Sequence, residues 1–127
     1  ICLGMQLLFE RSFEYGAHAG LGLIKGEIRP IADVIPEGLK IPHIGWNNLT
    51  FPNKGRLFEG IEENSFVYFV HSYFAECDMK NVIAMSDYDI EFTAAVQKDN
   101  VFGCQFHPEK SGDVGLKILK AFCEMGE

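Results

Sequence analysis

Apolar residues occur in short runs, and their spacing predicts a helix near each end of the chain. Leu7, Leu8 and Phe9 stand next to charged residues, which predicts an amphipathic helix over residues 3–15 that ends at Gly16. A second helix is predicted over residues 111–125, with Ser111 as its N-cap. The core-facing side of this helix would consist of Val114, Ile118, Ala121, Phe122 and Met125.

Between the helices, β-branched and aromatic residues predict strands. Glycines make residues 17–26 a predicted loop, and a short strand over residues 27–31 follows, limited by Pro30. Residues 41–51 mix apolar and polar positions, and residues 57–61 form at most one turn. The strongest strand is predicted over residues 66–70, and an antiparallel meander over residues 82–86, 92–96 and 101–106. This combination predicts an α/β architecture.

The composition fits one compact domain and disfavours anionic partners. A chain of 127 residues leaves little room for a second folding unit, and 47% hydrophobic residues exclude disorder as the main state. A formal charge of −7 repels phosphate backbones and anionic headgroups, so neither nucleic acid nor a membrane is an expected partner. The sequence has no apolar run approaching the roughly 20 residues that cross a bilayer. We therefore expect a cytoplasmic protein.

The four cysteines and the first residue add two expectations. Cys2, Cys77, Cys104 and Cys123 lack the close, repeated spacing of a disulfide framework, so reduced thiols are expected. The chain begins with Ile1 rather than Met, inside what looks like a motif. We expect residues 1–127 to be the C-terminal part of a single domain, with a strand and a glycine preceding Ile1 in the intact protein.

Cys2 lies directly before the first predicted helix, where helical N–H groups favour a thiolate over a thiol. The order Cys2-Leu3-Gly4 matches the second half of a strand-turn-helix elbow, in which a small residue two positions after the nucleophile permits tight packing. This arrangement predicts a nucleophilic cysteine. The position alone is equally consistent with a buried, unreactive thiol.

The triplet His107-Pro108-Glu109 supplies an imidazole and a carboxylate. Proline favours an extended His107, and residues two apart in an extended segment project to the same side, so Glu109 can orient one imidazole nitrogen while the other faces a thiol. A thiol, an imidazole and a carboxylate together predict covalent acyl transfer. Taken alone, the triplet is more often a histidine at a strand end beside a solvent-exposed carboxylate.

Other candidate groups carry weaker signals. We assign no catalytic role to His71. The pairs Cys104 with His107 and His71 with Cys77 lack the four-ligand pattern of a metal site, so neither a metal nor another cofactor is expected. The single tryptophan, Trp46, fits a core position and an interface position equally well.

Two stretches resemble the signatures of class I glutamine amidotransferases, namely Ile-Cys-Leu-Gly-Met-Gln at residues 1–6 and Gln-Phe-His-Pro-Glu at residues 105–109. Within that family the chain is most similar to the glutaminase subunits of imidazole glycerol phosphate synthases. Residues 40–47, 67–73 and 108–111 carry this narrower resemblance. The resemblance covers essentially the whole chain. It implies an α/β domain of the flavodoxin-like, doubly wound type, of which the N-terminal portion is lacking.

The resemblance also implies a role for each matching catalytic residue. Cys2 would attack the side-chain amide of glutamine, forming a glutamyl thioester and releasing ammonia. His107 would act as general base and acid, oriented by Glu109. The backbone N–H of Leu3 would be one oxyanion donor, and the second donor would lie outside this chain.

The substrate and partner contacts implied by the resemblance complete the prediction. Gln6 would contact the bound glutamine, and the backbone of Ser72 and Tyr73 would hold its amino-acid end. The ammonia would pass to a cyclase subunit with a (β/α)₈ barrel in histidine biosynthesis, across an interface that includes Pro42, Trp46, Asn47 and Lys110. Two alternatives stay open. The chain could serve another ammonia acceptor, in surface-sugar amination or anthranilate synthesis, or it could be a non-catalytic docking subunit.

Overall fold

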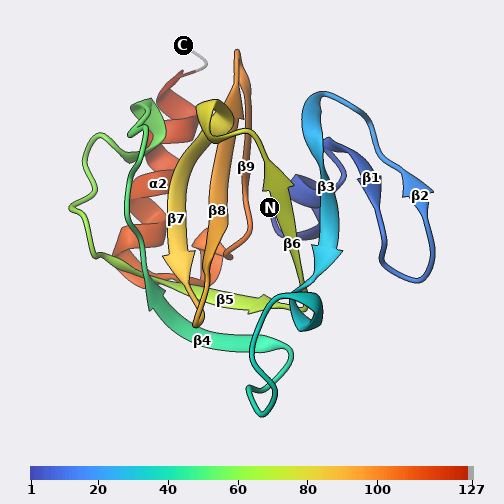
Figure 1. Cartoon of the computed structure of the whole chain (residues 1–127). Helices are drawn as coiled ribbons and strands as arrows, with labels where there is room; N and C mark the ends of the chain where they lie inside the picture. The colour runs from blue at the N-terminus through green and yellow to red at the C-terminus, as the bar shows by residue number, and fades with distance from the viewer. Residues whose placement is uncertain (126–127) are drawn as a thin grey trace.

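The computed structural model describes residues 1–125, which fold into a mixed arrangement of strands and helices (Figure 1). The helices are α1 (Leu3–Gln6) and α2 (Gly112–Met125). The strands are β1 (Phe9–Ser12), β2 (His18–Ala19), β3 (Ile24–Pro30), β4 (His43–Asn48), β5 (Phe66–His71), β6 (Tyr73–Cys77), β7 (Val82–Asp87), β8 (Glu91–Lys98) and β9 (Val101–Cys104). Short 3-10 turns are η1 (Ile31–Asp33), η2 (Arg56–Phe58), η3 (Met79–Asn81) and η4 (Pro108–Lys110).

The strands form three sheets, with the orders β2-β1-β3-β6, β4-β5 and β7-β8-β9. Strands β1 and β3 are paired in parallel, and the other strand pairs of these sheets are antiparallel. Figure 1 shows α2 on one side of the β7-β8-β9 sheet, with β1, β2 and β3 on the other side. The predicted α/β class is confirmed. None of the helices in residues 1–125 is long and apolar enough to cross a membrane.

The predicted helix over residues 3–15 is wrong beyond its first turn. Helix α1 ends at Gln6, and the chain continues into β1, where Phe9 lies opposite Ile24 of β3. Phe9 is fully buried by this pairing. Three consecutive apolar residues fit a helix or a strand equally well, and pairing with a distant strand decides between them. The loop expected over residues 17–26 accordingly contains β2 and the start of β3, which ends at Pro30 as predicted.

Strands β4 and β6 are not evident in the sequence pattern. In β4 the inward residue His43 is polar and only 4% exposed, whereas the outward residues Ile44 and Trp46 are 58% and 53% exposed. This polarity is the reverse of that of an ordinary half-buried strand, so alternation could not predict β4. Strand β6 is hidden because only Ser72 separates it from β5.

The predicted meander is confirmed, because β7, β8 and β9 pair antiparallel in sequence order. Asp87 lies opposite Glu91 and Lys98 opposite Val101, so short turns connect the strands where the sequence predicted them. The last strand ends at Cys104, two residues before the predicted boundary. The expected single turn over residues 57–61 is present as η2.

The C-terminal helix is confirmed as α2, with one difference on its core-facing side. Ile118 is 2% exposed, and Val114 and Met125 pack against the core. Phe122 is 53% exposed and lies edge-to-face with Phe102, with 6.0 Å between the ring centroids. Phe122 therefore covers the flank of β9 rather than entering the core.

Ser111 precedes α2, and its hydroxyl has a different role from the predicted N-cap. The hydroxyl donates to the carbonyl of His107 at 2.7 Å and accepts from the N–H of Tyr68 at 2.9 Å. Ser111 holds the predicted N-cap position, since its carbonyl accepts from the Gly115 N–H at 3.2 Å, but its hydroxyl bonds to His107 and Tyr68 rather than to an N–H of α2. Ser111 instead fixes the His107 turn against β5.

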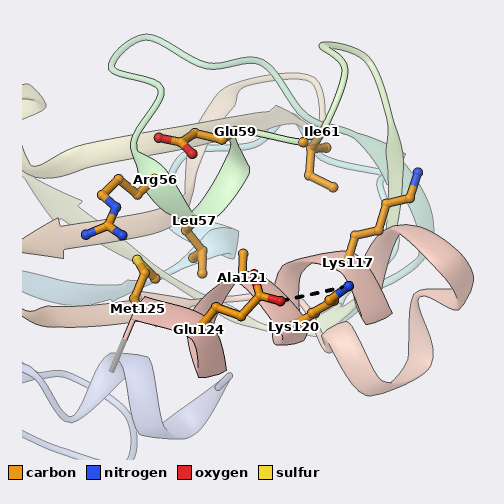
Figure 2. A pocket seen from close by; sticks show the side chains of 10 residues that line it. Arg56, Leu57, Glu59, Ile61, Lys117, Lys120, Ala121, Glu124 and Met125 are labelled. Atoms are coloured by element: carbon orange, nitrogen blue, oxygen red, sulfur yellow. Dashed lines mark ion pairs between the residues drawn. The ribbon is translucent and has the colours of Figure 1, made fainter. Parts of the chain in front are cut away.

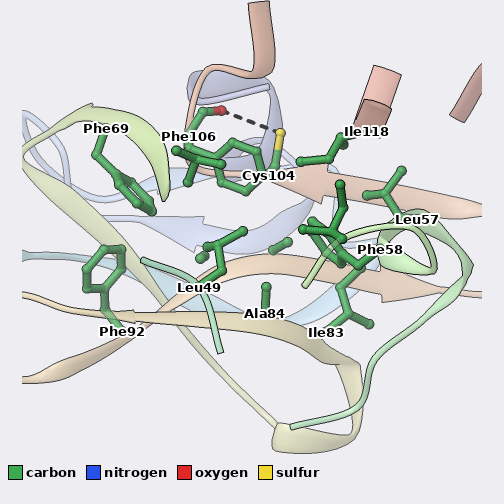
Figure 3. Packing of buried hydrophobic residues seen from close by; sticks show 14 of the residues in the cluster. Leu49, Leu57, Phe58, Phe69, Ile83, Ala84, Phe92, Cys104, Phe106 and Ile118 are labelled. Atoms are coloured by element: carbon green, nitrogen blue, oxygen red, sulfur yellow. Dashed lines mark hydrogen bonds between the residues drawn. The ribbon is translucent and has the colours of Figure 1, made fainter. Parts of the chain in front are cut away.

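Two apolar clusters hold these elements together. The larger cluster lies under β5, the meander and α2, and Figure 3 shows Phe69, Phe92 and Phe106 converging there. The smaller cluster joins α1 to β1 and β3 through Met5, Phe9, Ile24 and Ile28. A Cβ atom at Gly103 would lie 2.6 Å from the Met5 side chain, so this glycine lets α1 lie directly on β9.

A cavity of about 390 Å³ lies between η2 and α2 (Figure 2). Side chains of both charges line it, and Lys120 lies 3.8 Å from Glu124 as an ion pair. None of the residues that line this cavity was predicted from the sequence to take part in catalysis, substrate binding or partner binding. The charged side chains around this cavity are exposed, so we interpret it as a solvated hollow at the surface and not as the candidate active site.

Candidate active site

Cys2 occupies a strained backbone turn immediately before α1. Its backbone angles are φ 52° and ψ −110°, outside the regions that residues with a side chain normally adopt. Such a conformation costs on the order of 1–3 kcal/mol and persists only where neighbouring structure enforces it. Here the N–H of Cys2 donates to the carbonyl of Cys104 at 2.7 Å, and the Cys2 carbonyl accepts from Gln6 at 3.2 Å. The strain therefore lies at the residue predicted to be the nucleophile.

The N–H of Leu3 is available beside this turn. Leu3 is the first residue of α1, so its N–H has no partner within the helix. Across residues 1–125, it donates to no other backbone group. A free N–H directly after a cysteine is the arrangement that an oxyanion donor requires.

Cys2 opens onto a cavity of about 400 Å³, within the range of about 300–1,000 Å³ typical of small-molecule sites. The lining contains all five residues predicted for the nucleophile, the oxyanion donor or the substrate contacts, and adds two others. The full lining set is Cys2, Leu3, Gln6, Glu14, Tyr15, Ser72 and Tyr73. The structure thus brings together residues that are some 70 positions apart in the chain.

Glu14 and Tyr15 also line this cavity, although the sequence predicted no role for either residue. Both belong to the predicted helix over residues 3–15. In the structure they lie in the turn between β1 and β2, and the N–H of Glu14 donates to the Ser12 hydroxyl at 3.2 Å. Tyr15 and Gly16 have φ values of 55° and 101° in this turn. The glycine was the feature of the sequence that could have indicated the turn.

His107 and Glu109 are joined as a pair, though they do not line this cavity. The imidazole Nδ1 lies 2.9 Å from a carboxylate oxygen of Glu109. A carboxylate only accepts, so Nδ1 carries the hydrogen and Nε2 is left as the basic nitrogen. The η4 turn that follows His107 holds this geometry, together with the bond from the His107 N–H to the Tyr68 carbonyl at 3.0 Å.

Strand β5 brings Cys2 and His107 to the same region without direct contact. The Cys2 sulfur lies 3.9 Å from the carbonyl of Val70, and His107 is bound to Tyr68 two residues earlier. Two residues along a strand correspond to about 7 Å. Within residues 1–125, no hydrogen bond joins the Cys2 sulfur to the His107 imidazole.

A comparison with known families identifies the group to which this site belongs. The family model described as glutamine amidotransferase class-I matches residues 1–125. The chain belongs to the class I glutamine amidotransferases. The expected resemblance is thereby confirmed over the whole described part of the chain.

Several curated relatives that this chain is similar to are named imidazole glycerol phosphate synthase subunit HisH. The chain is 52% identical to the protein of Wolinella succinogenes over 99% of this chain and 62% of that protein. It is 55% identical to the protein of Sulfurimonas denitrificans over 96% of the chain and 59% of the relative. With the protein of Methanocaldococcus jannaschii the identity is 49%, over 98% and 62%. The chain thus spans between 59% and 62% of the length of these relatives.

Gln105 is a further residue beside Cys2, and its side chain is fully buried. Its Nε2 lies 3.6 Å from the Cys2 sulfur, and its Oε1 accepts from Gln6 Nε2 at 3.1 Å. In the sequence, Gln105 is recognisable only as part of the Gln-Phe-His-Pro-Glu motif at residues 105–109. Its burial within an otherwise apolar strand end could not be read from residue order alone.

Two buried histidines, His43 and His71, lie beside the Ser72 turn that lines the Cys2 cavity. His71 Nδ1 lies 2.8 Å from the Tyr73 carbonyl, so Nδ1 donates and Nε2 accepts from His43 Nδ1 at 3.0 Å. Burial lowers the pKa of His71 to about 4 and also lowers the pKa of His43. Both rings are therefore neutral at pH 7, and the pair fixes the Tyr73 carbonyl at the cavity wall.

This pair predicts acid-sensitive folding. The pKa of His71 is about 4 in the folded state and 6.5 in the unfolded chain, so below pH 6.5 the unfolded state binds more protons. The stabilising effect of neutral His71 is complete above pH 6.5 and is lost as the pH falls toward 4. The expected loss of unfolding free energy is about 3 kcal/mol.

The measurement is chemical denaturation of wild type, His71→Gln and His18→Gln between pH 7.5 and 4. His18 is exposed, so His18→Gln should keep the wild-type pH dependence. His71→Gln should be less stable than wild type at pH 7.5, and its unfolding free energy should change less between pH 7.5 and 4. Equal slopes in all three proteins would contradict this role of His71.

The residues predicted to face a partner lie on or beside the outer side of β4 and η4. Pro42 and Lys110 are exposed, and Trp46 is half-exposed with its ring edge-to-face with Tyr68, at 6.1 Å between centroids. The amide of Asn47 donates to the Asp87 carbonyl and lies 3.5 Å from His43 Nε2. Trp46 is therefore a surface residue here, not a core anchor.

The remaining thiols are set apart from Cys2 by burial or position. Burial raises the pKa of the Cys104 thiol to about 12 and also raises that of Cys77. Both thiols are protonated at neutral pH and therefore poor nucleophiles. Among the described residues, no cluster of histidine, cysteine or carboxylate side chains has the arrangement of a metal site.

Proposed function

We propose that this chain carries the glutaminase chemistry of its family, hydrolysing glutamine to glutamate and ammonia with Cys2 as the nucleophile. The observation that carries the proposal is the strained Cys2 turn, which opens onto a cavity shared with Leu3, Gln6, Ser72 and Tyr73. Strain at a turn before a helix exposes a side chain at the tip, which is how nucleophile elbows present their reactive atom.

The reaction proceeds through a thioester. The Cys2 sulfur attacks the amide carbon of glutamine, and a carbon–sulfur bond forms as the carbonyl oxygen becomes an oxyanion facing the N–H of Leu3. His107 Nε2 takes the thiol proton and returns it to the leaving nitrogen, so the carbon–nitrogen bond breaks and ammonia departs. Water then attacks the thioester with the same base, releasing glutamate and restoring the thiol.

Proton transfer requires a shorter distance between Cys2 and His107 than the described structure shows. Cys2 contacts β5 at Val70 only through a long 3.9 Å contact of its sulfur, whereas the backbone of His107 is bonded to Tyr68, so a rotation of either side chain changes the distance between them. Catalytic hydrogen bonds in unliganded enzymes are often long and tighten only with substrate bound. Glu109 keeps the imidazole in the tautomer that this step needs.

The cavity wall suits the amino-acid end of glutamine. Glu14 is the acidic side chain among the lining residues and complements the α-ammonium group. The N–H of Ser72 donates to no backbone group in residues 1–125 and is free to bind the α-carboxylate. Gln6 contacts the side-chain amide from the floor of the cavity.

The ammonia acceptor proposed is the cyclase subunit of imidazole glycerol phosphate synthase, a (β/α)₈ barrel, in cytoplasmic histidine biosynthesis. The support is the name of the three relatives described above, each about 50% identical to this chain over nearly its whole length. The exposed Trp46 with Pro42, Asn47 and Lys110 forms the surface proposed to meet this subunit. A solvent-facing tryptophan is typical of interface anchors.

Glutamate release by the intact protein, with and without such a cyclase, tests this function. We expect turnover to rise by at least about tenfold with the cyclase, in the range of typical couplings between sites. Turnover that is unchanged when the cyclase is added would indicate that the protein serves another ammonia acceptor. An absence of turnover in both conditions would contradict the enzymatic proposal and favour a docking subunit.

A further inference from the structure

Gln105 has an unusual environment for an uncharged polar residue. Its side chain is fully buried, and both ends of its amide have a defined partner. Its backbone N–H donates to the Ala94 carbonyl at 2.8 Å, so the residue is anchored to β8. A buried amide is costly unless all its groups are satisfied, and here one of the partners is the Cys2 sulfur.

The orientation of the Gln105 amide follows from a chain of contacts that ends at a backbone carbonyl. Gln6 Nε2 lies 3.5 Å from the Tyr73 carbonyl, which only accepts, so this end of Gln6 must be the NH₂ group. The same NH₂ contacts Gln105 at 3.1 Å, so Gln105 presents its oxygen to Gln6. The NH₂ of Gln105 is therefore the group that faces the Cys2 sulfur at 3.6 Å.

We propose that Gln105 is a positioning residue for the nucleophile, donating a hydrogen bond that stabilises the Cys2 thiolate over the thiol. The proposal extends the function given above, since it concerns how that function's nucleophile is activated. A thiolate accepts hydrogen bonds far more strongly than a thiol, so an N–H fixed toward the sulfur favours loss of the thiol proton. Gln6 keeps Gln105 in this orientation from the cavity side.

The direct test is the pH dependence of Cys2 alkylation by iodoacetamide, followed by mass spectrometry of the Cys2 peptide. In Gln105→Met, which keeps the side-chain length and removes the donor, we expect the midpoint of alkylation to move up by about one pH unit. The exposed Cys123 serves as an internal reference whose midpoint stays fixed. Gln97→Met, on the same sheet but bonded to the Asp99 carbonyl, is the matched control and should leave Cys2 unchanged.

The outcomes separate this proposal from the proposed function. Alkylation needs no glutamine turnover, so a protein without glutaminase activity can still show the shift. An unchanged or lower midpoint in folded Gln105→Met would overturn the role of Gln105 even if glutaminase activity is present. A change only in the alkylation rate at high pH would indicate altered access and would also count against it. If Gln105→Met does not fold, Gln105→Asn withdraws the donor from the sulfur and should produce the same upward shift.

Discussion

Cys2→Ala is expected to reduce glutamine hydrolysis by about four to six orders of magnitude while the protein stays folded. Covalent catalysis stops when the nucleophile is removed, because neither His107 nor the oxyanion donor can form the thioester. The side chain is only partly buried, and its contacts are weak ones to the Val70 carbonyl and Gln105. The substitution leaves the packing around α1 in place, so the expected loss of activity is chemical and does not come from unfolding.

The measurement is glutamate release, with thermal melting of the same samples as the folding check. Cys123→Ala is the matched control, since Cys123 is exposed on α2 and should keep full activity. Turnover of Cys2→Ala at the wild-type rate would show that Cys2 is not the nucleophile. A similar loss of activity in Cys123→Ala would show that replacing a cysteine lowers the activity by destabilising the protein.

His107→Gln is expected to lower the rate of glutamine hydrolysis by about two to four orders of magnitude, the usual contribution of a general acid–base. Glutamine keeps a polar side chain that can still contact Glu109 but cannot accept and return the thiol proton. The main-chain bond of this residue to Tyr68 and the Ser111 contact to its carbonyl are both retained. The fold of η4 should therefore persist.

Glu109→Gln provides the graded comparison. Its carboxylate orients His107 from a half-exposed position, with 46% of the side chain accessible, so water replaces part of its effect. We expect a smaller loss than for Cys2→Ala, measured as kcat with saturating glutamine. Losses of equal size in Cys2→Ala and Glu109→Gln would contradict the division of roles between nucleophile and orienting group.

The parts of the fold that the sequence predicted are those with local, regular patterns. The meander from β7 to β9 combines strong strands with short polar turns, and α2 has an apolar face at helical spacing. Both signals depend only on neighbouring residues. The error at the start has the opposite cause, because Phe9 enters β1 through its pairing with Ile24, a contact that local spacing cannot reveal.

The same distinction between local and distant contacts separates the site residues that the sequence predicted from those that it did not. The elbow around Cys2 and the His107-Glu109 pair were readable because each lies within a few consecutive residues. Gln105 and Glu14 were not assigned a role, since their proximity to Cys2 depends on how β9 and the β1–β2 turn lie against α1. Trp46 could not be placed either, because β4 carries its apolar residues on the outer face.

The central claim is that Cys2 attacks glutamine from the strained turn beside the cavity. Labelling with a glutamine analogue that carries a chloromethyl ketone in place of the carboxamide tests this claim directly, with peptide mass spectrometry locating the adduct among the four cysteines. The account predicts a single adduct on Cys2 that glutamine suppresses by competition. An adduct on Cys77, Cys104 or Cys123 instead, or labelling of Cys2 that glutamine does not slow, would contradict it.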